Sequence, residues 1–265
     1  MSDILKEIIL HKREEVEAAK AKRPLSDIMA LLPDLPPTRS LKASLLNHPE
    51  GGIISEFKRR SPSKGWIRQD ARVEDVIPAY EKAGAAALSI LTDLNFFGGH
   101  LNDILVARPL SSLPILRKDF VIDAYQLFEA RAVGADACLL IASVLDAATC
   151  HHLAAVAHDI GLEVLLEIHE EKELEAFSPY VDIIGVNNRN LHLFQTDPVQ
   201  SVKLFPLLPK EAVPISESGL LKPSIAAHLS SVGYKGFLIG EAFMKEAQPG
   251  EALALYRQEL QQPER

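Results

Sequence analysis

The chain has 265 residues, 47% of them hydrophobic and 24% charged, and its formal net charge at pH 7 is -8. This length suits one large α/β unit, and the acidic balance argues against nucleic acid or an anionic membrane as a partner, since both require a basic face. The two cysteines, Cys138 and Cys150, form no CxxC motif and no disulfide framework.

The N-terminal segment is charged throughout and lacks the apolar centre of a signal peptide. The longest uncharged apolar runs fall well short of the ~18 residues that a membrane span needs. We therefore expect a cytoplasmic protein.

Residues 1–48 are predicted to form a helical extension that packs on the main body. Ser2 can cap a first helix, apolar side chains then recur at helical spacing, and Pro24 marks the end of that helix. Two shorter helical stretches, 26–32 and 40–46, lie on either side of a proline-rich segment. We expect this extension and residues 49–265 to form a single domain overall.

From residue 49 onward, short apolar runs alternate with amphipathic stretches of helical period. Several stretches end in glycine just before the next run, at Gly84, Gly134 and Gly161, which is typical of a helix C-cap. Continuous apolar strands are buried on both faces, as in parallel sheets, so eight of them predict a (β/α)₈ TIM barrel behind the helical extension. The alternative is an open doubly wound sheet, but no glycine-rich dinucleotide loop follows the first run. The eight runs are GIISEF, AALSIL, LPILRK, ACLLIA, EVLLEI, DIIGVN, AVPISES and GFLIGE.

Active sites of such barrels lie at the carboxyl ends of the strands, and here most strands end in polar or titratable residues. Neighbouring side chains of a strand point in opposite directions, so Lys118 should face the barrel mouth while Arg117 and Asp119 pair with surrounding structure. The strand-end segments are SEFKRRSPSKG, LTDLNFFGG, RKDF, LLEIH, GVNNRN, SESG and IGEA.

The loops after the last two strands are predicted to bind a phosphate. In (β/α)₈ barrels these loops hold phosphates with backbone amides, and small residues let the backbone approach an anion. Ser218 and Gly219 follow the seventh strand and Gly240 follows the eighth, although glycines that only permit tight turns are the alternative. A carboxylate would repel a phosphate, so we expect the Glu241 side chain to turn away.

Three titratable residues, Lys58, Lys118 and Glu167, end the first, third and fifth strands and could converge over the mouth. A desolvated lysine has a lowered pKa and becomes a usable general acid, whereas a buried glutamate has a raised pKa and is a better base near neutrality. Each residue alone could be a solvated charge at a strand end. The three together favour a catalytic site.

Other chemistries are not indicated by the motifs. No HExxH, GxSxG or P-loop motif is present, so we expect no metal site. The charged run 169–175 is interpreted as the exposed start of a helix. Phe96 and Phe97, beside two glycines, are interpreted as an aromatic lid on a mobile loop or, alternatively, as core under a turn.

The longer motifs resemble those of indole-3-glycerol phosphate synthases over essentially the whole chain, including the helical extension. They include SEFKRRSPSKG, SILTDLNFFGG, ILRKDFVIDAYQLFEARAVGADACLLI, IGVNNRNL and FLIGEAFM. The resemblance implies the conversion of carboxyphenylamino-deoxyribulose phosphate into indole-glycerol phosphate, carbon dioxide and water in tryptophan biosynthesis, without a cofactor. It implies a phosphosugar substrate and says nothing about association with other enzymes of that pathway.

By this resemblance, Lys118 would be the general acid of ring closure and Glu167 the base of dehydration. Lys58 would pair with the substrate carboxylate and serve as a second acid. Many relatives carry serine where this chain has Glu241, which leaves the role of that side chain open. The remaining matches orient the substrate and the lysines (Glu56, Asn187, Arg189), enclose the anthranilate ring (Phe97, Phe120, Leu139, Leu191) or surround the phosphate (Ser61, Ser218, Gly219, Gly240, Glu241).

Three alternatives remain open. A Schiff-base lyase on the same fold would use Lys118 or Lys58 to attack a carbonyl. A non-catalytic phosphosugar-binding or scaffold protein would not need Lys118 or Glu167. A phosphoribosylanthranilate isomerase would not be expected to carry the long extension or the lysine of the first strand.

Overall fold

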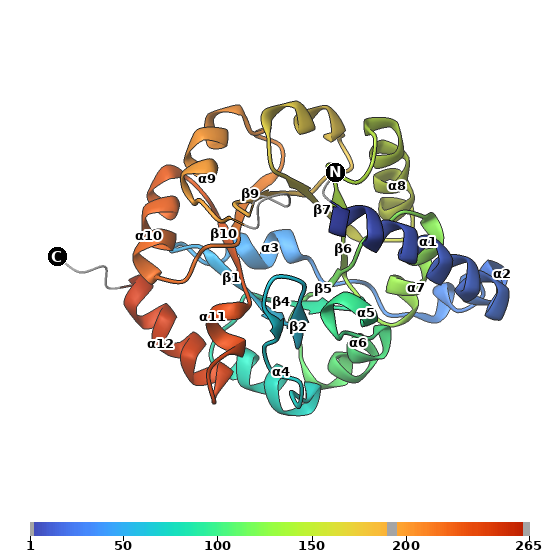
Figure 1. The fold of residues 1–265 in the computed structure, drawn as a ribbon, viewed down its shortest axis with the longest axis horizontal. Coiled ribbons are helices and arrows are strands. Elements are labelled where there is room, and N and C mark those ends of the chain that lie inside the picture. The colour runs from blue at the N-terminus through green and yellow to red at the C-terminus, as the bar shows by residue number, and fades with distance from the viewer. Residues whose placement is uncertain (1–2, 190–194, 262–265) are drawn as a thin grey trace.

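The computed structural model describes residues 3–189 and 195–261. Eight parallel strands close into a barrel in the order β1-β10-β9-β8-β7-β6-β5-β4, and helices surround it (Figure 1). Each of the eight apolar runs contains one strand, so the predicted (β/α)₈ barrel is confirmed. The strands are β1 (Gly52–Phe57), β4 (Ala87–Leu91), β5 (Ile115–Lys118), β6 (Ala137–Ile141), β7 (Glu163–Ile168), β8 (Ile183–Asn187), β9 (Val213–Glu217) and β10 (Gly236–Ile239).

Short polar caps and glycines set the ends of the outer helices. Asp123 and Asp146 accept hydrogen bonds from backbone N–H groups in the first turns of their helices. Gly84, Gly134 and Gly161 have positive φ angles just past helix ends, as predicted. The helices are α4 (Val73–Lys82), α5 (Leu94–Phe97), α6 (Leu101–Ala107), η2 (Arg108–Leu110), α7 (Ala124–Ala132), α8 (Ala147–Asp159), η3 (Glu171–Ala176), α9 (Val199–Leu204), η4 (Phe205–Leu207), α10 (Pro223–Val232), α11 (Glu241–Met244) and α12 (Pro249–Gln261).

One expected helix differs. The charged run 169–175 does not begin an exposed α-helix, because η3 is a short 3₁₀ helix whose Glu173 is buried. The Glu173 carboxylate accepts the backbone N–H of His169 at 2.5 Å, so this acidic residue is used inside the structure. A charged run in the sequence therefore includes one carboxylate that faces inward.

The hydrophobic core has two parts, as strands buried on both faces require. Ile53 belongs to the larger part, between the barrel and its helices, whereas its neighbour Ile54 belongs to the smaller part inside the barrel. Leu41 and Leu45 join the inner part, although they lie before the first strand. No helix within the described residues is both long and apolar enough to cross a membrane.

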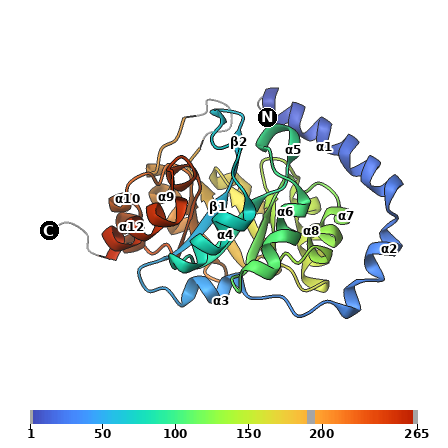
Figure 2. The ribbon, with the colours of Figure 1, turned by 90° about the horizontal axis from the view of Figure 1, so that it is seen from below.

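The segment before β1 reaches both ends of the barrel. It comprises α1 (Asp3–Lys22), α2 (Leu25–Met29), η1 (Leu32–Asp34) and α3 (Leu41–Leu46). In Figure 2, α1 lies at the end of the barrel that also carries the β2 hairpin (Arg60–Ser61, paired with β3, Gly65–Trp66), and α3 lies at the opposite end. Leu45 of α3 leaves no room for a Cβ at Gly52 or Gly236, where β1 and β10 begin, and so closes that end. The boundary at residue 48 stays a prediction.

A buried ion cluster attaches α1 to the barrel. Lys12 is fully buried, and its Nζ lies 3.0 Å from Asp93 and 2.9 Å from Asp119. Burial alone would lower the pKa of Lys12, but the carboxylates of Asp119, Asp93 and Glu15 outweigh it and raise that pKa. The ammonium therefore stays charged and ties the helix to the loops after β4 and β5.

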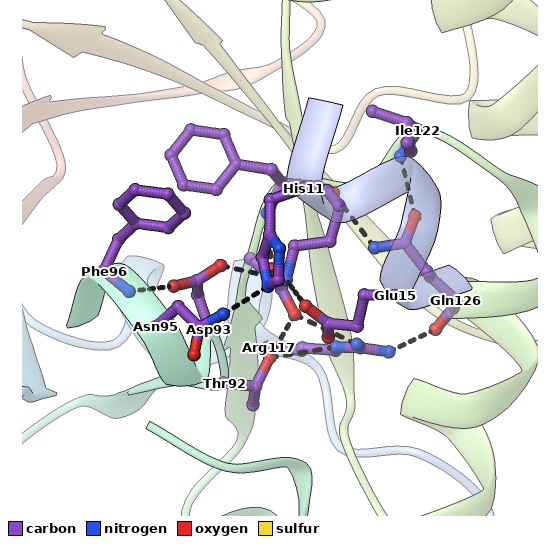
Figure 3. Close-up of polar contacts among 12 residues, drawn as sticks. His11, Glu15, Thr92, Asp93, Asn95, Phe96, Arg117, Ile122 and Gln126 are labelled. Carbon is purple, nitrogen blue, oxygen red and sulfur yellow. Dashed lines mark hydrogen bonds and ion pairs between the residues drawn. The ribbon is translucent and has the colours of Figure 1, made fainter. Parts of the chain in front are cut away.

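Arg117 and Asp119 belong to the same cluster. Arg117 donates to Asp119 at 3.0 Å, to Thr92 Oγ1 at 3.1 Å and to the Gln126 carbonyl at 2.6 Å (Figure 3). The prediction that the two neighbours of Lys118 pair with surrounding structure is confirmed. Their pairing holds the residue between them in one orientation.

Replacing Lys12 with methionine is expected to lower the free energy of unfolding by about 3–5 kcal/mol, because it leaves buried carboxylates without their cation. Chemical denaturation followed by circular dichroism measures this change. Lys6→Met on the exposed side of the same helix is the matched control and should change stability little. Equal losses in the two variants would contradict the anchoring role.

Candidate active site

A cavity of about 470 Å³ opens at the carboxyl ends of the strands. Residues from all eight barrel strands and from loops that follow them line it, together with the start of α1. The predicted site residues that the structure describes all line this cavity: Glu56, Lys58, Ser61, Phe97, Lys118, Phe120, Leu139, Glu167, Asn187, Arg189, Ser218, Gly219, Gly240 and Glu241. Leu191 lies outside the described residues.

Lys118 occupies the floor of the cavity between two carboxylates. Its Nζ lies 3.2 Å from Glu167 Oε2 and 3.5 Å from Glu217 Oε2. Burial alone would lower the pKa of Lys118, but the negative charges of Glu167, Glu217 and Glu56 outweigh it, so the pKa is raised. The prediction of a lowered pKa for Lys118 was wrong, because it included desolvation but not the neighbouring carboxylates. Lys118 is thus a firmly charged proton donor.

Glu167 uses its two oxygens for different partners. Oε1 accepts a hydrogen bond from Asn187 Nδ2 at 3.0 Å and lies 3.6 Å from His169 Nε2, whereas Oε2 faces Lys118. Burial alone would raise the pKa of Glu167, but Lys118, His169 and Asn187 lower it overall. The prediction of a raised pKa for Glu167 was wrong, because it did not include these neighbours. The Glu167 carboxylate is ionised and can accept a proton.

Glu217 is a site residue that the sequence analysis missed. It ends β9 with 2% exposure, just before the predicted phosphate residues. Burial raises the pKa of Glu217 to about 8, Glu167 and Glu56 add to the rise, and Lys118 opposes it. The sequence does contain a signal for Glu217: it is the last residue of its strand, as Lys118 is of β5, and it could have been assigned to the mouth on the same ground.

Glu56 and Lys58 form a second acid–base pair beside the first. The Lys58 ammonium donates to the Glu56 carboxylate, and both residues line the cavity. A Cβ at Gly240 would lie only 2.3 Å from Glu56 Oε1, so glycine is required there for the carboxylate to fit. Lys58, directly after β1, and Lys118, at the end of β5, therefore each face a carboxylate in the cavity.

The other end of the cavity combines cations with small residues. Ser218 has a φ of 65° and Gly219 one of 74°, so two successive residues after β9 adopt the left-handed region. This conformation is uncommon for a serine and concentrates at functional sites. The Asn188 side chain holds the turn by donating to the carbonyls of Glu217 and Ser218, a role that the sequence analysis also missed.

Glu241 departs from its predicted orientation. Its carboxylate lines the cavity, with one oxygen 3.7 Å from Lys64 Nζ and the other 3.7 Å from an Arg189 nitrogen. The side chain is therefore not turned away, because the two cations attract it. Arg189 also donates to Ser63 Oγ at 2.8 Å, which joins the β2 hairpin to this end of the site.

An apolar wall completes the cavity. The rings of Phe97 and Phe120 lie 5.9 Å apart, and Leu139 of β6 lines the same space. Phe97 belongs to the short helix α5, whereas Phe96 packs against His11 of α1 at 6.0 Å. The wall also includes Ile4, Leu5 and Ile8 of α1, which lie far from the barrel in sequence and were not predicted.

Comparisons with known proteins agree with this arrangement. A family model described as indole-3-glycerol phosphate synthase matches residues 5–254. An indole-3-glycerol phosphate synthase of Bacteroides thetaiotaomicron is 52% identical over 261 residues, which cover 98% of this chain and all of that protein. One of Azoarcus sp. is 45% identical over 259 residues, which cover 96% and 98% of the two chains.

Solved structures with low sequence identity share the fold. A thiamine phosphate pyrophosphorylase from Pyrococcus furiosus superposes with a TM-score of 0.61 at 15% identity, covering 84% of this chain and 98% of that one. A 3-hexulose-6-phosphate synthase from Salmonella typhimurium gives 0.61 at 13% identity, covering 80% and 100%. These likenesses support the barrel alone.

Proposed function

This chain belongs to the indole-3-glycerol phosphate synthase family of carboxy-lyases in tryptophan biosynthesis, and we propose that its cavity carries out that reaction by the steps below. The substrate is 1-(2-carboxyphenylamino)-1-deoxyribulose 5-phosphate, and the products are indole-3-glycerol phosphate, carbon dioxide and water. The observation that carries the proposal is the Lys118–Glu167 pair, 3.2 Å apart, on the floor of a cavity with an apolar wall and a cationic end.

The cavity offers a complement to each part of this substrate. Phe97, Phe120 and Leu139 provide an apolar surface for the aromatic ring. Arg189 and the turn at Ser218 and Gly219 are placed to hold the phosphate at the other end. Lys58 and Arg189, together with backbone groups, can bind the carboxylate and the phosphate of the substrate even though the whole chain is acidic.

Glu241 must share the cations at the phosphate end. Its carboxylate pairs with Lys64 and Arg189, at 3.7 Å from each, and would repel a phosphate. The side chain has to give up this position when the phosphate binds. Glu241 therefore competes with the substrate, and its backbone N–H is its contribution to binding.

Ring closure needs an acid. The ring carbon that bears the carboxylate attacks the ketone, and negative charge develops on the ketone oxygen. The Lys118 ammonium stabilises this charge and donates its proton, which is favourable despite its raised pKa because an alkoxide is a stronger base than an amine. Lys58 pairs with the substrate carboxylate until that group leaves.

Decarboxylation restores the aromatic ring. The carboxylate leaves as carbon dioxide, and its electron pair returns to the ring system. An apolar setting favours this step because it disfavours the charged carboxylate relative to the neutral product. The wall of Phe97, Phe120 and Leu139 provides that setting.

Dehydration needs a base and a second acid. Glu167 takes a proton from the methylene carbon, and its ionised state suits this role. Glu217 donates a proton to the departing hydroxyl group, since its pKa of about 8 keeps it protonated at neutral pH. Lys58, the second acid that the resemblance suggested, remains the partner of the carboxylate.

The role of Glu217 predicts a pH dependence. Raising the pH through about 8 ionises Glu217, which removes its proton and also holds the Lys118 ammonium more tightly, so turnover should fall. Glu217→Gln should lower kcat by about 10²-fold and abolish the decline around pH 8. Rates of indole formation between pH 6 and about 9.5 measure both effects. If the rate of indole formation by Glu217→Gln still declined near pH 8, the decline would have to come from another titratable group.

The function itself is tested by mixing the protein with the carboxyphenylamino substrate and following indole fluorescence. Stoichiometric carbon dioxide release should accompany it. Borohydride added during turnover should trap no covalent adduct, whereas a Schiff-base lyase would be trapped through Lys118 or Lys58. Binding of the substrate without an indole product would favour a phosphosugar-binding protein.

A further inference from the structure

His169 is a half-buried titratable residue with two buried ring nitrogens, and the proposed reaction does not use it. It follows β7, and within the described residues neither ring nitrogen has a hydrogen-bond partner. Instead the ring lies between two carboxylates: Nε2 is 3.6 Å from Glu167 Oε1, and Nδ1 is 3.6 Å from Glu173 Oε2. A small tilt of the ring would close either contact into a hydrogen bond. An imidazole with buried nitrogens in this position needs an explanation.

The reaction supplies a reason for such a group. Ring closure places one proton on the ketone oxygen, and dehydration places another on the departing hydroxyl. Only one proton is taken back, from the methylene carbon, and the departing carbon dioxide releases none. Each turnover therefore consumes one proton, which must come from solvent and reach a cluster whose two carboxylates, Glu167 and Glu217, are each only 2% exposed.

We propose that His169 relays this proton from solvent, through Glu173, into the catalytic cluster of Glu167, Lys118 and Glu217. This inference rests on the proposed function, because the proton deficit follows from that reaction. His169 does not touch the substrate in this scheme. It is a positioning and relay residue that acts through Glu167.

Each transfer joins neighbouring atoms. At the end of a cycle Glu167 is protonated, Lys118 is neutral and Glu217 is ionised. Glu167 returns its proton from Oε2 to Lys118 Nζ over 3.2 Å, and Lys118 passes one on to Glu217 Oε2 over 3.5 Å. The imidazolium then gives its Nε2 proton to Glu167 Oε1, and the Glu167 carboxyl group turns to pass this proton to Lys118. The neutral ring, left with its proton on Nδ1, returns to the Nε2–H tautomer by proton exchange with water. Nδ1 then takes a replacement proton from Glu173, and Glu173 takes one from hydronium in solvent.

The charges around His169 suit a proton carrier. Burial lowers the pKa of His169, but Glu173 on η3, Glu167 on β7 and Glu217 on β9 outweigh it and raise that pKa. Gln200 of α9 donates to the His169 backbone carbonyl at 2.7 Å, a hydrogen bond that does not involve the ring. The side chains of His169 and Glu173 are 14% and 7% exposed, so the outer end of the relay is in contact with solvent.

The test compares the first turnover with the following ones. The cluster begins with its two transferable protons in place, on Lys118 and Glu217, so His169→Asn should form the first equivalent of indole at the wild-type rate and then turn over about 10²-fold more slowly. Imidazole buffer should restore the slow phase in proportion to its imidazolium content. Glu173→Gln, which still accepts the His169 backbone N–H, should show the same pattern and provides a second test should His169→Asn fold poorly.

The control is His152→Asn on the exposed face of α8, which should leave both phases unchanged. Steady turnover at the wild-type rate in His169→Asn and Glu173→Gln would overturn the relay. So would an equal slowing of both phases without rescue by imidazole, which is what a structural role of His169 predicts. An absence of indole formation by the wild-type protein would instead refute the proposed function.

Discussion

Replacing Lys118 with methionine is expected to lower kcat/KM by about 10⁴-fold, since the variant loses both the proton donor and the positive charge that face the ketone oxygen. Formation of indole measures this loss. Binding of indole-3-glycerol phosphate, followed by its fluorescence, should change little, because Arg189 and the turn at Ser218 and Gly219 are untouched. A variant that retains more than a few per cent of turnover would exclude Lys118 as the acid.

Lys118→Arg separates the two contributions of this residue. An arginine keeps a positive charge beside Glu167 and Glu217, but its pKa is too high for it to release a proton. Lys118→Arg also controls for misfolding of Lys118→Met, in which the buried carboxylates are left without a cation. We expect Lys118→Arg to fold like the wild type and to stay inactive. Substantial activity would mean that charge alone drives ring closure.

Replacing Glu167 with glutamine is expected to slow dehydration by about 10²–10⁴-fold, because an amide cannot take the proton from the methylene carbon. Ring closure and decarboxylation precede this step, so carbon dioxide should appear in a first turnover well before indole does. Stopped-flow absorbance for indole and a coupled assay for carbon dioxide measure the delay. The amide still offers an oxygen to Asn187, so the pocket should keep its shape.

Glu163→Gln is the matched control for this variant. Glu163 begins the same strand, and its carboxylate binds Ser40 and the backbone of Lys42 at the other end of the barrel. Its replacement should leave the order of carbon dioxide and indole unchanged. If Glu167→Gln only raised KM and released both products together, the base would have to be sought elsewhere.

Sequence patterns predicted most of the polar residues that line the cavity, because the ends of buried strands can be recognised in a sequence. Strands buried on both faces appear as apolar runs, and in a closed parallel barrel all their carboxyl ends meet at one mouth. Lys118 was assigned to the mouth and Arg117 to the surroundings from strand alternation alone, and both placements hold. Glu217 ends β9 as Lys118 ends β5, so the same reasoning about strand ends applies to Glu217, which the sequence analysis did not include.

Other features depend on contacts between distant segments. Residues of α1 line the cavity, and α3 closes the opposite end, although nothing in the pattern of the extension indicates where it packs. Glu173 is buried, although in the sequence it does not differ from its charged neighbours in the run 169–175. In the sequence, Lys12 is one of many charged residues in its helix. The structure shows that it is buried against Asp93 and Asp119.

The sequence by itself determined the eight-stranded barrel and the residue types gathered at its mouth. These follow from local rules, since strand period and helix caps act over a few residues. Only the tertiary structure decided the protonation states. Burial alone predicts a lowered pKa for Lys118 and a raised one for Glu167, and the structure reverses both, because opposite charges from different strands lie within 3.5 Å. Coulombic interactions depend on distances in space, and those distances exist only after the barrel has closed.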